Sequence, residues 1–225
     1  MTSSNESPHP LMSFTLAVLF GVLTGISAQI RFNVGPVPYT MQNFPVILSG
    51  IVLTPKYALM SQLIYLLLIA LGMPLASGMR GGIHVLIGYT AGYLWGFPIA
   101  SYLMSLLTRY YLKFKGLKSL SPMSLSRRLV LLLISFIAVI PMYILGFLVF
   151  LHYATSPTPL GESLLNWSRD VSSMIYGLND ITTLIFLTAV LIFIPQDILI
   201  DHLLAVNIAP IIIKILKARG VGLDI

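Results

Sequence analysis

Long apolar stretches occupy most of this 225-residue chain, and they constrain its fold more than any other feature. Hydrophobic residues make up 57% of the sequence and charged residues 9%, whereas a soluble domain carries about 25% charged residues. The mean hydropathy is +0.92. A chain with so few charges cannot cover its surface in water, so the composition predicts a single polytopic, all-α integral membrane domain over residues 1–225.

Six membrane spans are predicted, at about residues 11–30, 39–54, 57–73, 83–107, 129–153 and 195–216. The second is short, near the lower limit of about 17 residues for a spanning helix. The last apolar stretch is too long for one span and too short for two with a loop. We therefore expect an apolar approach segment at 181–194 and a break at Pro195, because proline is tolerated in the first helical turn.

The basic residues gather in loops on one side of these spans. If the N-terminus lies in the cytoplasm, ten of the thirteen lysine and arginine residues also face the cytoplasm: Lys56, Arg109, Lys113, Lys115, Lys118, Arg127, Arg128, Lys214, Lys217 and Arg219. This bias is the positive-inside signature and predicts cytoplasmic N- and C-termini. It also accounts for the net charge of +6, so the positive charge does not indicate that the protein binds nucleic acid. The first ten residues lack the basic region and cleavage motif of a secretory signal, so the first span is expected to be retained.

Two carboxylates interrupt the last apolar stretch, at Asp197 and Asp201, and His202 follows. An ionisable residue inside the bilayer is expensive and is a functional-site hypothesis by default. Positions four apart share a helix face, so both carboxylates could point into one cavity. Alternatively, Asp197 caps a helix that begins near Pro195, and Asp201 pairs with His202 or lies at the lipid interface. One helical turn supplies too few ligands for a metal site.

Neutral hydrogen-bonding residues cluster where the second apolar stretch begins. Tyr39, Thr40, Gln42 and Asn43 follow two prolines that favour extended backbone. They indicate either a binding site or a helix cap in which Thr40 or Asn43 accepts from backbone amides.

Glycines mark the segment around the start of the fourth stretch. Arg80, Gly81 and Gly82 lie in an outer loop, and Gly88, Gly92 and Gly96 recur every four residues. Such glycines let a ligand approach the backbone closely, or they allow close helix packing through small-xxx-small spacing. A similar stripe, Ala17, Gly21 and Gly25, faces either another span of this chain or a partner subunit.

Several catalytic signatures are absent from the sequence. It contains no Gly-x-x-x-x-Gly-Lys-Ser/Thr, His-Glu-x-x-His or Gly-x-Ser-x-Gly motif. We therefore expect no enzyme activity and no cofactor bound by this chain.

Three segments together resemble the BioY family, the biotin-binding S components of energy-coupling-factor (ECF) vitamin transporters. The family's Pro-x-Pro-x-Thr-x-Gln segment is similar to residues 36–42. Its Gly-Pro-Thr-Gly-Gly-Tyr segment is similar to residues 88–93, and its Phe-x-Pro-Gly-Asp-x-x-Lys segment to residues 193–200. The order and spacing match from Phe14 to about Leu216. Four positions depart from the family pattern: Tyr89, Ala91, Gln196 and Ile200, the last in place of a lysine.

The resemblance implies a six-helix S component that takes up biotin with high affinity across the bacterial plasma (inner) membrane. Its implied partners are a transmembrane coupling subunit, which would contact Ala17, Gly21 and Gly25, and two ATPase subunits that use ATP. Asp197 is expected to accept hydrogen bonds from the ureido N–H groups of biotin. Arg80 is the nearest candidate to bind the carboxylate of biotin, and it is also the first candidate for a cation beside Asp197. The expected substrate-binding residues are Asp197, Gln42, Asn43, Thr40, Tyr39, Arg80, Gly81, Gly82, Thr90 and Tyr93, and Tyr89 could also line the apolar ring.

Other functions stay open at this point. Because Ile200 replaces the lysine, the chain could be an S component for another vitamin. It could also be a stand-alone ion-coupled transporter that uses Asp197 and Asp201 as a proton or cation relay. An intramembrane enzyme that uses these carboxylates and His202 is disfavoured by the missing motifs.

Overall fold

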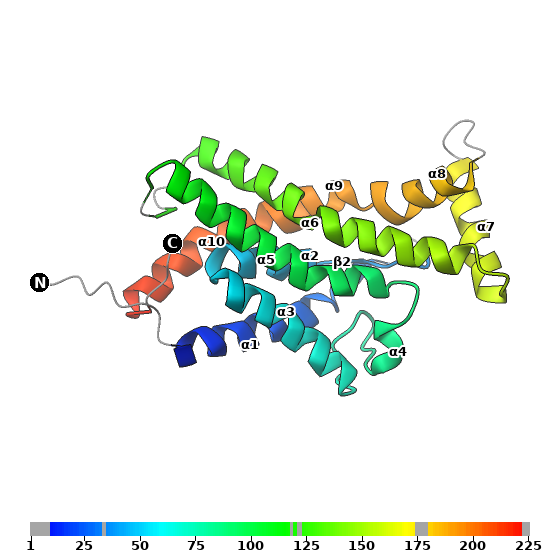
Figure 1. Cartoon of the computed structure of the whole chain (residues 1–225), viewed down its shortest axis with the longest axis horizontal. Coiled ribbons are helices and arrows are strands. Elements are labelled where there is room, and N and C mark those ends of the chain that lie inside the picture. Colours follow the sequence, from blue (N-terminus) through cyan, green and yellow to red (C-terminus); the bar gives the residue numbers. More distant parts are fainter. Residues whose placement is uncertain (1–9, 33–34, 118, 121–122, 174–179, 222–225) are drawn as a thin grey trace, which may run out of the picture.

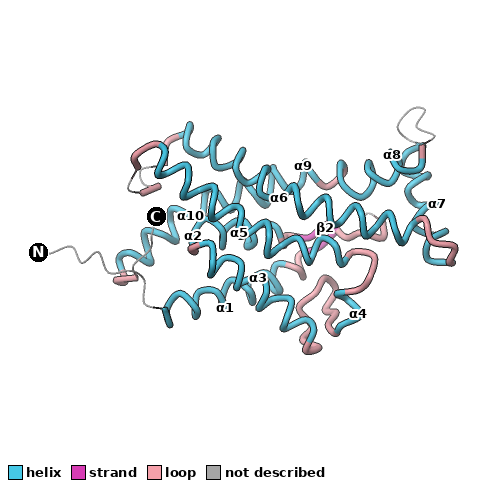
Figure 2. The backbone as a smooth tube through the Cα atoms, in the orientation of Figure 1, coloured by secondary structure: helices cyan, strands magenta, loops and turns pink. Residues whose placement is uncertain are grey.

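Helices dominate the computed structural model, which describes residues 10–32, 35–117, 119–120, 123–173 and 180–221. The helices run along one long axis, and a short antiparallel pair, β1 (Arg31–Phe32) and β2 (Tyr39–Thr40), lies among them (Figure 2). Lys118 and residues 1–9 and 222–225, whose cytoplasmic location was predicted from the sequence, lie outside the described residues.

Three helical segments of the described chain are long and apolar enough to cross a membrane: α1 (Pro10–Ser27), α6 (Leu125–Ala154) and the continuous stretch Ile181–Ala218. Helices α3 (Pro55–Ala70), α4 (Ile83–Leu86) and α5 (Ala91–Phe114) come between α1 and α6 in the sequence (Figure 1). The structure therefore has the helical membrane character that the composition predicts.

The second predicted span is much shorter in the structure. Helix α2 covers only Asn43–Val52, about 15 Å at 1.5 Å per residue, which is half of a hydrocarbon core of about 30 Å. Residues 39–42, predicted to belong to the span, form β2 and a turn because the prolines before them hold the backbone extended. The fourth stretch is also divided, since α4 and α5 are separate helices.

The last stretch is helical from Ile181 to Ala218 except for two turn residues, Ile192 and Phe193, directly before α9 (Ile194–Gln196), and Pro195 lies in the first turn of α9 as predicted. This last helical rod comprises α8 (Ile181–Phe186), the π-helical segment η1 (Leu187–Leu191), α9, the π-helical segment η2 (Asp197–His202) and α10 (Leu203–Ala218). The backbone N–H of Ile192 donates to the carbonyl of Leu187, five residues back (3.1 Å). Such wide turns accommodate a proline, which lacks an N–H, without ending the helix.

The rod begins where a side chain caps it. Asp180 accepts hydrogen bonds from the backbone N–H and the hydroxyl of Thr183, both at 2.8 Å. These bonds favour the charged carboxylate and hold the pKa of Asp180 below its usual range. The helix start is therefore at residue 181, and Asp197 lies inside the rod rather than at a cap.

The stripe of small residues on α1 packs against α3 and the loop that follows it. Ala17 is fully buried, a Cβ on Gly21 would lie 2.6 Å from the carbonyl oxygen of Ser61, and one on Gly25 would lie 2.7 Å from Leu75. Of the two alternatives for this stripe, the structure shows contact with another helix of this chain. These three positions are covered within the chain in this conformation, and their contact with a partner subunit stays a prediction.

The glycines of α5 form a similar contact with α6. A Cβ on Gly92 would collide with the backbone of Leu145 and Gly146, and one on Gly96 with the backbone of Met142. Gly88 precedes α5, and its Cβ would have only ordinary contacts, the nearest at 3.4 Å. Close helix packing therefore accounts for two of the three glycines.

The outer surface of α6 carries an exposed apolar stripe, as expected of a helix that faces lipid. Leu129, Leu133, Ile137, Ile140, Ile144 and Leu148 are each between 40% and 60% exposed. They recur every three or four residues and so share one helix face.

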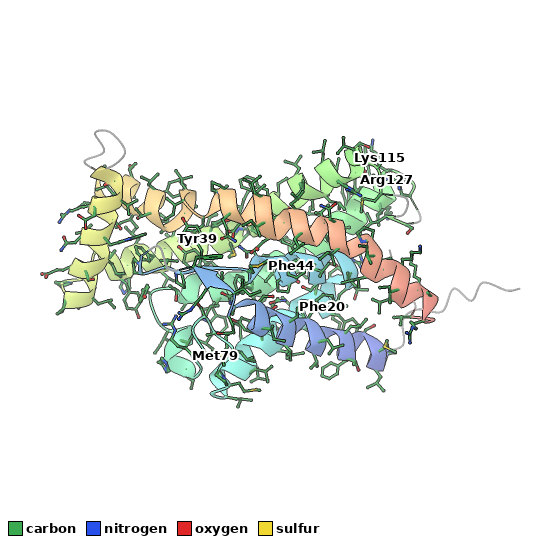
Figure 3. The ribbon with its side chains drawn as sticks, turned by 180° about the vertical axis from the view of Figure 1, so that it is seen from behind. Phe20, Tyr39, Phe44, Met79, Lys115 and Arg127 are labelled. Atoms are coloured by element: carbon green, nitrogen blue, oxygen red, sulfur yellow. The ribbon has the colours of Figure 1, made fainter. Side chains whose placement is uncertain are left out.

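Helix α7 (Pro159–Ser173) lies across one end of the bundle (Figure 1). The ring centroid of Trp167 lies 6.5 Å from that of Phe150 on α6. The opposite end of the molecule holds Lys115, Arg127 and the end of α10 (Figure 3).

Candidate functional site

A cavity of about 670 Å³, including the space at its mouth, lies among β2, α2, α5, α6 and the last helical rod. The loop between α3 and α4 forms a further wall. The lining residues are Val37, Pro38, Thr40, Gln42, Asn43, Ala76, Ser77, Arg80, Val85, Thr90, Tyr93, Leu94, Phe97, Met142, Tyr143, Phe193, Gln196 and Asp197.

The negative group of this cavity is Asp197. Its side chain is 4% exposed, and the hydroxyl of Tyr143 on α6 donates a hydrogen bond to its Oδ2. The side chain of Asn43, at the start of α2, also hydrogen-bonds to it. Both groups are neutral, so they stabilise the carboxylate by hydrogen bonding and leave its charge uncompensated.

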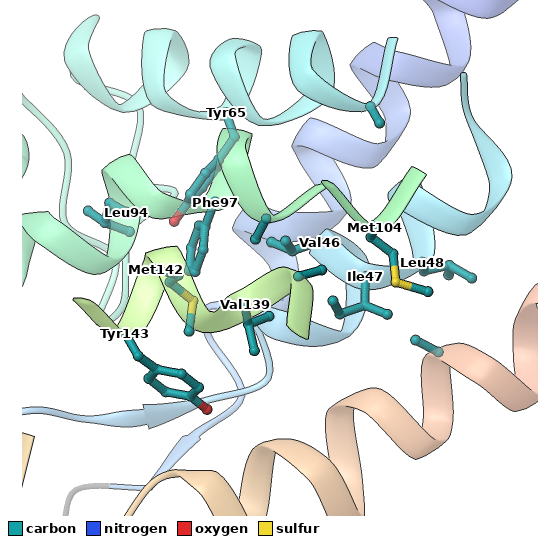
Figure 4. Close-up of a cluster of buried hydrophobic side chains, with 14 of the residues drawn as sticks. Val46, Ile47, Leu48, Tyr65, Leu94, Phe97, Met104, Val139, Met142 and Tyr143 are labelled. Carbon is teal, nitrogen blue, oxygen red and sulfur yellow. The ribbon is translucent and has the colours of Figure 1, made fainter. Parts of the chain in front are cut away.

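The position of Tyr143 follows from the packing of α6. Figure 4 shows Met142 and Val139 on the same helix within the apolar cluster, while the ring of Tyr143 lies at the edge of that cluster. Its hydroxyl is thereby brought to the last helical rod, where Asp197 lies.

Gln42 is held by a chain of hydrogen bonds that joins three elements. Thr40 Oγ1 donates to Gln42 Oε1 (2.8 Å), and Gln42 Nε2 donates to the hydroxyl of Tyr65 on α3 (2.6 Å). Tyr65 donates in turn to the carbonyl of Leu75 (3.3 Å). Because its amide groups are engaged, Gln42 fixes the shape of the wall around the start of α2.

Three buried polar atoms on the wall have no hydrogen-bond partner among the described residues: Asn43 Oδ1, Ser77 Oγ and Gln196 Oε1. Buried polar groups are nearly always hydrogen-bonded in folded proteins. Unpaired acceptors around a cavity therefore indicate groups that a ligand or water would satisfy. Asn43 and Gln196 both flank Asp197 on the lining, so they add acceptors beside its charge.

Apolar side chains form the rest of the wall. Phe97 comes from α5, Met142 from α6 and Phe193 from the last rod. The ring of Tyr39 packs behind Phe193, with centroids 4.5 Å apart. The cavity therefore combines an apolar surface with one polar edge.

Seven of the ten predicted substrate-binding residues meet at this cavity: Asp197, Gln42, Asn43, Thr40, Arg80, Thr90 and Tyr93. Of these, Tyr93 donates its hydroxyl hydrogen to the carbonyl of Ala189 (2.5 Å), which ties α5 to the last rod. The structure brings together side chains from segments more than 150 positions apart in the sequence.

The other three predicted residues do not line the cavity. Tyr39 donates to the carbonyl of Ile192 (3.0 Å). Gly81 lies where a Cβ would collide with the carbonyl of Met73, and Gly82 has a φ of 101°, which favours glycine. These residues support the wall. Tyr89, also expected near the ligand ring, instead donates to the carbonyl of Pro36 (2.9 Å).

Arg80 is exposed on the loop between α3 and α4, where its Nε donates to the carbonyl of Ser77 (3.0 Å). It is the only cationic residue among the described residues of the lining. The hydrogen-bond partners of Asp197 are Tyr143 and Asn43, so Arg80 is not the immediate neighbour of Asp197 that the sequence suggested.

Asp201 is separated from the cavity, and the expectation that both carboxylates point into it is wrong. Asp201 and His202 are fully buried and do not belong to the lining. The π-helical turn of η2 places these residues differently from the regular α-helix assumed for the sequence. Burial also excludes the lipid-interface position considered for Asp201.

Sequence reasoning missed Tyr143, Phe97 and Met142, which lie in apolar stretches without a polar cluster. A lone tyrosine directly after Pro141 and Met142 was the available signal on α6. Phe193 and Gln196 lay inside a recognised segment but were given no role. Ser77 belongs to the loop that contains Arg80 and was likewise not selected.

The sequences of curated relatives align with up to about half of this chain. A Pyrococcus horikoshii protein named probable biotin transporter BioY is 46% identical over 106 residues, 46% of this chain and 65% of the relative. A Bacillus subtilis protein of the same name is 41% identical over 96 residues, covering 43% and 52%. The Thermotoga maritima biotin transporter BioY is 42% identical over 91 residues, covering 40% and 54%. The matched segments thus span less than two thirds of each relative.

The fold matches a crystal structure described as the S-component for biotin from an ECF-type ABC transporter. The TM-score is 0.62 at 22% sequence identity, over 98% of this chain and 96% of the other. This likeness shows a shared fold over the whole bundle. The family model described as the BioY family matches residues 1–218, so the chain belongs to the BioY family.

Proposed function

We propose that this chain binds biotin in the cavity beside Asp197 and is the substrate-binding S component of an ECF-type transporter for biotin uptake. The observation that carries the proposal is one buried carboxylate, held by Tyr143 and Asn43, on the wall of a cavity that several helices line. Membership of the BioY family supports it, as do the names of the relatives and of the structural neighbour.

The chemistry of the cavity fits the parts of biotin. The ureido N–H groups are donors, and Asp197 is a charged acceptor, a pairing stronger than a neutral hydrogen bond. The unpaired oxygens of Asn43 and Gln196 are further acceptors at the same edge. Phe97 and Phe193 offer apolar surface to the thioether ring and chain, and Arg80 at the exposed loop offers a cation to the carboxylate.

The proposal includes a six-helix bundle in the bacterial plasma (inner) membrane, with the short α2 as its second helix and both termini in the cytoplasm. The supporting observation is that Lys115, Arg127 and the end of α10 share one end of the bundle (Figure 3), while α7 lies across the opposite end (Figure 1). The partners in this proposal are a transmembrane coupling subunit and two ATPase subunits, which hydrolyse ATP. The chain itself would be a transporter component, would bind no cofactor and would catalyse no reaction.

Binding of radiolabelled biotin to the purified protein in detergent tests the proposal. Asp197→Asn should weaken binding about 10- to 100-fold, because hydrogen bonds to a charged group are worth about 1.5 to 3 kcal/mol. Arg80→Ala should weaken it about two- to fivefold, since an exposed ion pair contributes up to about 1 kcal/mol. Arg169→Ala, on exposed α7, is the matched control and should bind as the wild type does.

Unchanged affinity in both cavity variants would refute the assignment of these residues. Competition by a panel of unlabelled vitamins tests the substrate itself. If another vitamin displaces biotin, or binds while biotin does not, the chain is an S component for that vitamin.

A further inference from the structure

A tight hairpin between α3 and α4 carries the cation of the cavity. Its residues 76 and 80 pair in an antiparallel bridge, in which the backbone N–H of Ala76 donates to the carbonyl of Arg80 (2.9 Å). Ser77 and Arg80 line the cavity. The Nε of Arg80 donates to the carbonyl of Ser77, whereas no hydrogen bond joins its two Nη groups to the described residues. One nitrogen of the guanidinium is thus engaged by the hairpin, and the other two can bind a carboxylate.

The turn of the hairpin 76–80 contains an unfavourable backbone conformation. Met79 has a φ of 58°, in the left-handed region that residues other than glycine, asparagine and aspartate seldom adopt. Gly78, directly before it, has a φ of 76°. The side chain of Met79, labelled in Figure 3, is 64% exposed, so contacts of that side chain do not compensate for the conformation. A contact to the backbone of the turn is therefore needed to hold it.

Gln29 provides this contact from the chain just after α1. Its Oε1 accepts a hydrogen bond from the backbone N–H of Met79 (2.9 Å). Its Nε2 donates to the carbonyls of Gly25 on α1 (2.9 Å), Ala76 (3.1 Å) and Leu75 (3.4 Å), so its two hydrogens are shared among three acceptors. The opposite orientation of the amide would place its oxygen against three carbonyl oxygens, which cannot donate. One side chain thus joins α1 to the first arm and to the turn of the hairpin.

Loss of the Gln29 amide would fall on two backbone groups of the hairpin. The carbonyl of Leu75 keeps a second donor, the hydroxyl of Tyr65 (3.3 Å). Ala76 is only 2% exposed, so water does not readily replace the Nε2 donor at its carbonyl. Within the described part of the chain, the backbone N–H of Met79 donates to Gln29 alone. These two residues flank both lining residues of the hairpin, which would move with them.

We infer that Gln29 is a positioning residue for Arg80. Its amide fixes the hairpin 76–80 in the conformation that keeps the guanidinium at the cavity wall, ready for the carboxylate of biotin. Gln29 does not line the cavity and acts through the hairpin. A side chain that is already ordered loses less conformational freedom on binding, so the ion pair that it forms is stronger. This role of Gln29 rests on the proposed function, in which Arg80 binds the carboxylate of biotin.

Biotinol, in which a hydroxymethyl group replaces the carboxylate of biotin, separates this role from general damage to the cavity. Binding of both ligands is measured on the purified protein in detergent, with unlabelled biotinol displacing radiolabelled biotin. Gln29→Ala should weaken biotin binding about two- to fivefold, the contribution of an exposed ion pair. It should weaken biotinol binding less than about twofold, because no carboxylate is present. Equal losses for the two ligands would refute the positioning role.

Asn207→Ala is the matched control for the loss of an amide. Asn207 lies on α10, and its Nδ2 donates to the carbonyl of Leu203, four residues earlier (2.7 Å). The amide of Gln29 makes the same kind of bond to Gly25. The control should bind both ligands as the wild type does. The double variant Gln29→Ala/Arg80→Ala should bind biotin no more weakly than Arg80→Ala alone, since residues that act as one unit are not additive. Multiplied losses would overturn the inference.

Limited proteolysis tests the hairpin without any ligand. Trypsin cuts after Arg80 when the hairpin opens locally, so Gln29→Ala should speed cleavage at this bond several-fold, and Asn207→Ala should leave it unchanged. An unchanged rate in Gln29→Ala would contradict the hold on the hairpin. If the wild-type protein binds neither biotin nor biotinol, the proposed function is refuted. If it binds both and Gln29→Ala weakens them equally, only the positioning role fails.

Discussion

Replacing Gly92 by alanine should force α5 away from α6. The new Cβ would collide with the carbonyl oxygen of Leu145 and lie 2.9 Å from the Cα of Gly146. These are backbone atoms, which cannot rotate aside, so the cost lies near the upper end of the overpacking range, about 3 kcal/mol. The higher helix propensity of alanine stabilises the helix by about 1 kcal/mol relative to glycine. The net loss is about 2 kcal/mol.

Thermal unfolding of the purified protein in detergent measures this loss. On the scale of soluble domains of similar length, about 2 kcal/mol lowers the Tm by about 4 to 8 °C. Biotin binding should weaken as well, because Tyr93 on α5 and Tyr143 on α6 form facing walls of the cavity. Gly88→Ala is the matched control, since the nearest atom to its Cβ is 3.4 Å away. Equal Tm values for the two variants would refute the packing argument.

Three further outcomes are expected. Gly21→Ala should lower the Tm of the isolated chain, because its Cβ would lie 2.6 Å from the carbonyl of Ser61; an unchanged Tm would contradict packing of this stripe within the chain. Tyr143→Phe should weaken biotin binding about tenfold or more in the radiolabel assay, since Asp197 loses a donor; wild-type affinity would contradict that role. Ile200→Ala should change biotin affinity by less than about twofold, as a surface substitution does; a tenfold loss would place Ile200 at the ligand.

Composition and hydropathy were sufficient to predict a helical membrane protein, because the energetic cost of polar groups in lipid leaves few alternatives. They were insufficient for the helix boundaries. Residues 39–42 were assigned to the second span, yet β2 and a turn occupy them. Pro195 was predicted to divide the last stretch, yet the chain is helical on both sides of it, with Pro195 in the first turn of α9. Both errors arise because local backbone hydrogen bonding, and not hydropathy, decides where a helix starts or ends.

The site was predictable where polar residues cluster in the sequence and was not where one side chain acts alone. Thr40, Gln42 and Asn43 stand out as neighbours at the start of an apolar stretch, and all three line the cavity. Tyr143 stands alone in an apolar part of α6, with no other polar residue between Ser135 and His152. Its role depends on which face of α6 meets the last rod, and this is a property of tertiary packing that no local pattern contains.

The isoleucine at position 200 has a different meaning once the register of the last rod is known. Its side chain is 44% exposed on the outside of the bundle, while Asp197 is 4% exposed at the cavity and Asp201 is fully buried. A lysine side chain that faces the hydrocarbon core is energetically costly, so an apolar residue suits this exposed position of the fold. The polar chemistry of the cavity comes from Asp197, Tyr143 and Asn43, which the substitution leaves in place. The departure from the family motif at Ile200 therefore changes the outer surface of the helix and is compatible with biotin as the substrate.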